Sequence, residues 1–235
     1  MEKLVMPLWR SDELSGDQFR DVLLTLAGEQ LAGLHAVRGL RLAVVDSAVA
    51  EAEGKRMDSF GGLPDAVLSV WLDSVTELAA LQEALDSVVV KSAAYLVTES
   101  EQIVNREAAD ASGRMPGFAQ VVFLQRPEEL TEAAWLDIWQ GSHTTVAIET
   151  QSTFAYRQNV IVRALGEGAA PYSAMIEESF PLAAMTSDHA FYDAADDETL
   201  QANMTAMMES CSRFIDFQRI DVMPVSEYLI PVSSG

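Results

Sequence analysis

The same order of predicted secondary structure occurs twice in this chain of 235 residues. Residues 3–104 and residues 117–230 each read as strand, helix, strand, strand, helix, strand. A repeat of this length constrains the architecture before any single residue is considered, because each copy folds as one supersecondary unit. The pattern is typical of a ferredoxin-like unit, whose antiparallel sheet carries both helices on one face. The opposite face of each sheet is then left uncovered.

Two such units in one chain can cover each other's bare faces. We therefore predict an α+β protein in which two ferredoxin-like units pair sheet to sheet into a barrel within one chain. Alternate residues of the predicted strand 154–163 are mixed in polarity on both faces, whereas a sheet with one solvated face alternates cleanly. The predicted organisation is a first unit at residues 1–104, a polar linker at 105–116 and a second unit at 117–231.

Local signals place some of these elements. Ser15 and Gln18 form a capping box that opens the first helix. Thr131 is placed to cap a helix over residues 132–149. The charged, glycine-containing stretch 50–62 predicts a mobile loop that is too polar to pack, and Asp46 just before it is interpreted as a turn aspartate.

Composition excludes several classes of function. The net charge of -21 argues against binding to nucleic acids or anionic membranes, since both require basic surfaces. The single cysteine, Cys211, rules out an internal disulfide. No run reaches the roughly 18 apolar residues of a membrane span, and the N-terminus lacks the apolar run of a signal peptide. We therefore expect a cytoplasmic protein.

One helix of the second unit carries unusual side chains. Trp135, Trp139 and His143 have the spacing i, i+4, i+8, which places them on one helical face. A histidine titrates near neutral pH and can move a proton. From spacing alone the favoured interpretation is structural, with two core tryptophans and a hydrogen-bonded histidine. The three histidines are scattered and lack Cys-His spacing, so we expect no metal site, and no cofactor-binding motif is present.

Residues 134–143 (AWLDIWQGSH) and 154–159 (FAYRQN) resemble the signature of the EthD family. That family has Trp-x-x-x-His on its first helix and a Tyr-x-Gln-Asn-like strand, and it belongs to the dimeric α/β-barrel superfamily. The resemblance covers about residues 117–229. It is weaker in the first unit, whose helix 19–31 has no tryptophan or histidine at matching positions. The chain thus resembles a tandem EthD protein.

The resemblance implies a cavity between sheet and helices for a small hydrophobic compound. It assigns His143 and Tyr156 as a catalytic acid–base pair. The ligand-binding residues that it implies are Trp135, Trp139, Gln158, Asn159 and Glu177. Since neighbouring side chains on a strand point to opposite faces, only one of Glu177 and Glu178 can face the cavity.

Two functions remain open from the sequence. The first is a cofactor-independent acid–base enzyme, of cyclase, isomerase, dehydratase or lyase type, acting on a small aromatic or polyketide-like compound. The second is a non-catalytic binding protein that serves a degradative or biosynthetic pathway. In either case the expected partner is a small hydrophobic molecule. We expect a monomeric barrel that can still dimerise through its helix faces.

Overall fold

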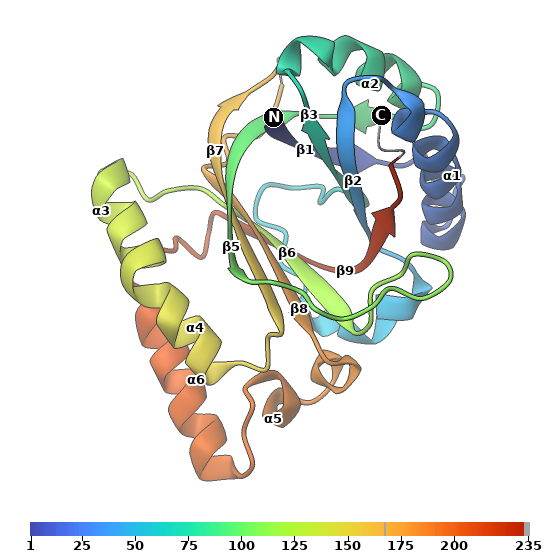
Figure 1. Cartoon of the computed structure of the whole chain (residues 1–235). Helices are drawn as coiled ribbons and strands as arrows, with labels where there is room; N and C mark the ends of the chain where they lie inside the picture. The colour runs from blue at the N-terminus through green and yellow to red at the C-terminus, as the bar shows by residue number, and fades with distance from the viewer. Residues whose placement is uncertain (167, 233–235) are drawn as a thin grey trace.

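The computed structural model describes residues 1–166 and 168–232, in which eight antiparallel strands close into a barrel with helices on two sides (Figure 1). Around the barrel the strands follow the order β1, β3, β2, β9, β6, β8, β7, β5 and return to β1. Their bounds are β1 (Glu2–Trp9), β2 (Val37–Val44), β3 (Ala66–Leu72), β5 (Tyr95–Ile103), β6 (Phe118–Leu124), β7 (Ala155–Ala164), β8 (Ala174–Phe180) and β9 (Ile220–Ile230). A two-residue strand, β4 (Lys91–Ser92), pairs with β1. The α+β class and the barrel within one chain are as predicted.

The two halves of the chain use the same pairing order. In residues 1–104 the strands lie in the order β2, β3, β1, β5, and in residues 117–231 in the order β7, β8, β6, β9. Two seams join these sheets. At one seam β2 pairs with β9, from Leu40 opposite Ile230. At the other seam β5 pairs with β7, from Tyr95 opposite Ala164.

Helices cover the outside of the barrel on two sides (Figure 1). Those of the first half are α1 (Gly16–Glu29) and α2 (Leu78–Leu85), and those of the second half are α3 (Glu132–Leu136), α4 (Thr144–Thr150), α5 (Asp188–Phe191) and α6 (Asp197–Cys211). Short 3₁₀ helices occupy Leu31–Gly33, Ser47–Lys55, Val75–Glu77 and Leu182–Met185. None of the helices described is long and apolar enough to cross a membrane.

Capping side chains begin the helices as expected. The Ser15 hydroxyl accepts from the Gln18 backbone N–H, and the Gln18 side chain accepts from the Ser15 N–H. Thr131 accepts from the Ala134 N–H. The helix predicted over 132–149 is not uniform, because a π-helix at Asp137–His143 separates α3 from α4. Such π segments are rare and often mark functional sites.

Apolar side chains fill three layers. The outer face of the first half is closed by aliphatic side chains such as Leu4, Met6, Leu42, Leu68 and Val70. One end of the barrel interior is filled by residues such as Val5, Val67, Val121, Phe123 and Met223. The outer face of the second half holds residues that include Val122, Trp135, Trp139, Ile176 and Phe214. Both faces of the sheet are thus covered.

The prediction that residues 50–62 form a loop too polar to pack was wrong. Residues 47–57, which we call the 47–57 segment, form the 3₁₀ helix and then pair with β9. Met57 exchanges two backbone hydrogen bonds with Val222, at N–O distances of 3.1 and 2.9 Å. Val49 and Ala52 are buried against an aromatic cluster of the second half. The small apolar residues between its charges give this segment a side that packs.

Candidate functional site

The strand β7 sends alternate side chains to the two sides of the barrel wall. Tyr156 packs with the outer cluster that contains Trp139. Arg157 points inward, where its guanidinium donates to both carboxylate oxygens of Glu227 at 3.1 and 3.2 Å. The same alternation on β8 places Glu178 on the outer face of the barrel and Glu177 on the inner face. The predicted site residues therefore divide between two environments.

A cavity of about 240 Å³ lies between the outer face of β6, β8 and β9 and helix α6. We call it the α6 pocket. Most of its wall is apolar, formed by residues that include Val122, Ile176, Met207, Phe214, Ile220 and Val222. Its polar wall includes His143, Tyr156 and Glu178, and the 47–57 segment of the first half adds Lys55 and Met57. Of the predicted catalytic and binding residues, His143 and Tyr156 line this pocket.

Three polar side chains form a row across the floor of the α6 pocket. Glu178 on β8 lies opposite Gln120 on β6 and opposite Tyr156 on β7. Directly opposed residues in antiparallel strands have Cβ atoms about 4.5–5.5 Å apart. Gln120 and Tyr156 therefore flank the Glu178 carboxyl within reach of one small ligand.

The phenol of Tyr156 is held by two donors. Trp139 Nε1 donates to its oxygen at 3.4 Å, and Gln158 Nε2 donates at 3.0 Å. Gln158 also donates to Thr144 Oγ1 at 2.8 Å, which fixes its amide. Burial, followed by the nearby Glu178 charge, raises the pKa of Tyr156 well above its ordinary value. The phenol therefore stays protonated at neutral pH and can donate a hydrogen bond.

His143 is neutral in this environment. Its Nδ1 lies 2.9 Å from Ser210 Oγ on α6, and its ring packs on Phe214 with ring centroids 4.6 Å apart. Burial, with a contribution from the Arg213 charge, lowers the pKa of His143 to about 4. A group with this pKa is a weak base at neutral pH, where an efficient general base has a pKa closer to 7.

The pKa of Glu178 suits a general base better than the pKa of His143 does. Burial raises the pKa of its carboxyl to about 7. Within residues 1–166 and 168–232 its carboxylate makes no hydrogen bond or ion pair, although part of the residue is accessible where it lines the pocket. A carboxyl with a pKa near 7 carries a proton in about half of the molecules at neutral pH, which favours proton transfer.

The other predicted binding residues lie outside the α6 pocket. Trp135 Nε1 donates to the Phe214 carbonyl at 3.0 Å, and its ring packs on Trp139. Both tryptophans are fully buried, which agrees with the structural interpretation of their spacing as core residues. Gln158 is also fully buried and acts on the site through Tyr156.

Asn159 and Glu177 instead belong to an ionic network inside the barrel. Lys3 Nζ donates to Asn159 Oδ1 at 2.8 Å and to Glu177 Oε2 at 3.2 Å. Burial alone would raise the pKa of Glu177, but Lys3, Arg41 and Arg157 outweigh it and hold this pKa well below its ordinary range. Glu177 therefore lies inside the barrel and away from His143, whereas Glu178 lines the α6 pocket. Ligand binding by either glutamate stays a prediction.

Sequence reasoning missed the contributions of Gln120 and Lys55. The opposing register of β6 and β8 identifies Gln120, but that register is a property of the folded sheet. Lys55 comes from a segment that looked too polar to pack. In neither case does the local sequence carry a signal.

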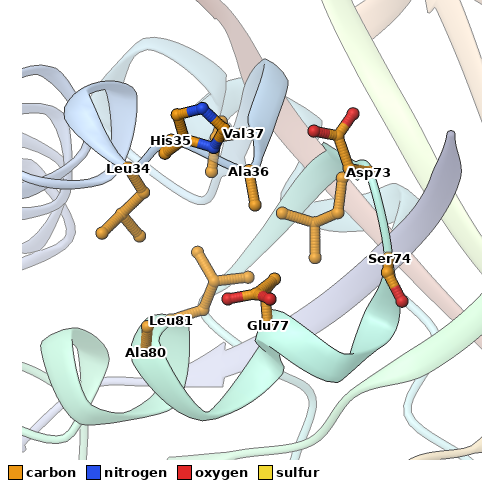
Figure 2. Close-up of a pocket in the computed structure, with 10 residues that line it drawn as sticks. Leu34, His35, Ala36, Val37, Asp73, Ser74, Glu77, Ala80 and Leu81 are labelled. Atoms are coloured by element: carbon orange, nitrogen blue, oxygen red, sulfur yellow. The ribbon is translucent and has the colours of Figure 1, made fainter.

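A second depression, of about 220 Å³, lies in the first half between the turn before β2 and the start of α2. Figure 2 shows its lining, with His35, Asp73 and Glu77 as its titratable groups. All three are exposed, and Asp73 accepts from Arg38 Nε at 2.9 Å. All three side chains are solvated and Asp73 is already paired with Arg38, so this depression is the weaker candidate.

The sequence matches no protein-family model and no curated protein. The fold does have relatives. A crystal structure of an anthrone oxidase-like protein superposes with a TM-score of 0.55 at 9% identity, covering 98% of this chain and 91% of the other. A candidate monooxygenase from Fusobacterium nucleatum subsp. nucleatum gives a TM-score of 0.50 at 9% identity, covering 99% and 93%. The chain therefore shares its overall fold with these two proteins, and in this chain one polypeptide forms the whole α+β barrel.

Proposed function

We propose that the chain is an acid–base enzyme that acts on a small hydrophobic molecule in the α6 pocket. The observation that carries this proposal is Glu178, a half-buried carboxyl that lines the pocket without a hydrogen-bond partner in the described structure, opposite Tyr156 and with its pKa raised to about 7. A purely structural carboxyl is expected to be paired, because an unpaired buried charge is costly. The absence of a partner for Glu178 in the described structure favours a functional role for this carboxyl.

The roles follow from the protonation states. Glu178, when ionised, takes a proton from a C–H next to a carbonyl or from a phenolic O–H. The electron pair moves to the substrate oxygen, where Tyr156 donates a hydrogen bond that stabilises the developing charge. Glu178 holds the proton until it is returned to another atom, which completes an isomerisation or assists elimination or cyclisation. Neutral His143 supplies a hydrogen-bonding wall.

The substrate class follows from the size and lining of the pocket. A volume of about 240 Å³ is slightly below the roughly 300–1,000 Å³ of sites for drug-sized ligands. A molecule of one or two rings fits this space, and the methionine and aromatic walls favour an apolar body. The oxidase-like and monooxygenase descriptions of the two similar folds are compatible with such a compound.

We further propose that the two halves are tandem ferredoxin-like, EthD-like repeats, divided at the linker 105–116. The identical pairing order of both halves supports this interpretation. In this interpretation the first repeat is the scaffolding copy, since aliphatic side chains fill its outer face. The outer face of the second repeat keeps polar side chains and forms the site.

Deuterium exchange tests the proposed chemistry directly. Incubation of an enolisable bicyclic ketone such as 2-tetralone in D₂O, followed by NMR, measures loss of its acidic protons. We expect the protein to accelerate exchange, and Glu178→Gln to reduce the acceleration by about 100-fold or more. Tyr156→Phe should reduce it less, and the exposed control Glu128→Gln should leave it unchanged.

The outcomes separate the two candidate functions. Exchange by Glu178→Gln at the rate of the unmodified protein would show that this carboxyl is not the base. If a panel of such ketones binds but none exchanges faster than in buffer, the chain is a binding protein and the enzymatic proposal fails.

A further inference from the structure

We propose that the ligand of the α6 pocket carries an acidic group, and that Lys55 of the first half binds it. This inference rests on the proposed function only in using the same pocket. Lys55 is the single lysine or arginine on the pocket lining within the described chain. It comes from the 47–57 segment, so the binding site is completed by the half that contributes no residue to the polar row of Gln120, Glu178 and Tyr156.

The Lys55 ammonium is held in place but is weakly paired. Its Nζ lies 4.3 Å from the centroid of the Phe191 ring and 3.5 Å from Asp188 Oδ1. The Lys55 side chain is 18% exposed, whereas that of Asp188 is 61% exposed. A long contact to a solvated carboxylate contributes at most about 1 kcal/mol. An ammonium has three donors, so a ligand anion can be bound without first breaking a strong ion pair.

The backbone that presents Lys55 is fixed. Met57 is joined to Val222 by two backbone hydrogen bonds. Beyond it, the Ser59 and Phe60 N–H groups donate to the buried carboxylate of Asp221 at 2.9 and 3.3 Å. The ammonium is therefore presented from an anchored segment, as a binding group requires.

The rest of the lining defines the body of the ligand. Three large apolar side chains of the pocket remain substantially exposed, namely Met57 at 37%, Met208 at 50% and Phe217 at 40%. With a net charge of -21 the protein repels anions at long range. A lysine beside an apolar surface then selects ligands that combine a ring system with one negative group. The class is an arene carboxylate, or an equally acidic phenol, of one or two rings.

Two probes of matched shape test this inference. The probes are 1-naphthoate and its neutral counterpart 1-naphthalenemethanol, with binding followed by their fluorescence at low salt. Lys55→Met should weaken binding of 1-naphthoate by about 10- to 100-fold, the loss expected for a hydrogen bond to a charged group. Binding of the alcohol should change less than about twofold, and Lys55→Arg should retain most of the affinity for 1-naphthoate.

Lys91→Met is the matched control. Lys91 also lies over an aromatic ring, at 4.1 Å from the centroid of Trp9, but it is not on the pocket lining. Lys91→Met should leave the affinities for 1-naphthoate and for 1-naphthalenemethanol unchanged. Equal weakening of the two probes by Lys55→Met would show a structural role and overturn the inference. So would an unchanged affinity for 1-naphthoate, or a protein that binds neither probe.

The same measurement in Glu178→Gln separates this inference from the proposed chemistry. That variant should bind 1-naphthoate at least as tightly as the unmodified protein even if exchange activity is lost, because it removes a partly ionised carboxyl from the same pocket. Conversely, selective binding through Lys55 in a protein that catalyses no exchange supports the binding inference while the enzymatic proposal fails.

Discussion

The carboxyl of Glu178 makes a quantitative prediction about stability. Burial raises its pKa from 4.5 to about 7. Between these pH values the folded protein holds a proton that the unfolded chain has released. The free energy of unfolding therefore falls as the pH rises through this window. At about 1.36 kcal/mol for each pH unit, the full loss amounts to about 3 kcal/mol.

Replacing the carboxyl by an amide removes this dependence. Relative to the unmodified protein, Glu178→Gln should gain about 1 kcal/mol at pH 5.5 and about 3 kcal/mol at pH 8, apart from a constant offset from the amide itself. The difference between the two conditions, about 2 kcal/mol, is free of that offset. Urea unfolding of both proteins at the two pH values measures it.

The control for this experiment is Glu128→Gln, whose carboxyl is 82% exposed. Its effect should be small and equal at both pH values. If the effect of Glu178→Gln were also equal at both pH values, the carboxyl would not be held protonated by burial. The argument that makes it the proton carrier would then lose its basis.

Two further predictions concern the barrel itself. Arg157→Met removes the cation that pairs with two buried glutamates, and it should lower the free energy of unfolding by about 3–5 kcal/mol. The exposed Arg219→Met, by comparison, should cost less than about 1 kcal/mol. Gly117 has a φ of 76°, and an added Cβ would lie 2.1 Å from the Phe180 carbonyl oxygen. Gly117→Ala should therefore destabilise strongly, whereas Gly28→Ala on α1, where a Cβ meets open space, should stabilise by up to about 1 kcal/mol. Urea titrations check both pairs, and similar effects within either pair would contradict the reasoning.

Local patterns predicted much of the fold. The repeated order of predicted strands and helices indicated a barrel within one chain. The capping residues Ser15 and Thr131 placed two helix starts, because a capping hydrogen bond acts within a few residues. The π-helix could not be predicted this way. Thr144 at its C-terminal end accepts a hydrogen bond from Gln158 on β7, a contact that exists only in the folded chain. The packing of the 47–57 segment likewise depends on a sheet that belongs to the other half.

The candidate site was predicted only in part for the same reason. Tyr156 and His143 could be named from the resemblance. The choice between Glu177 and Glu178 could not be made, because it depends on which face of β8 meets the helices. That face is fixed by the register with β6 and β7, which is a long-range property. A one-residue change of register would exchange the two glutamates.

Closure of the barrel has a consequence for the biosynthesis of the protein. The seam between β2 and β9 joins Leu40 to Ile230, so the chain through Ile230 must leave the ribosome before this seam can form. Until then β2 offers an unpaired edge to other nascent chains. Contacts so distant in sequence also form slowly. We therefore expect chaperones that shield exposed strands to raise the yield of this protein most while β2 has been synthesised and β9 has not.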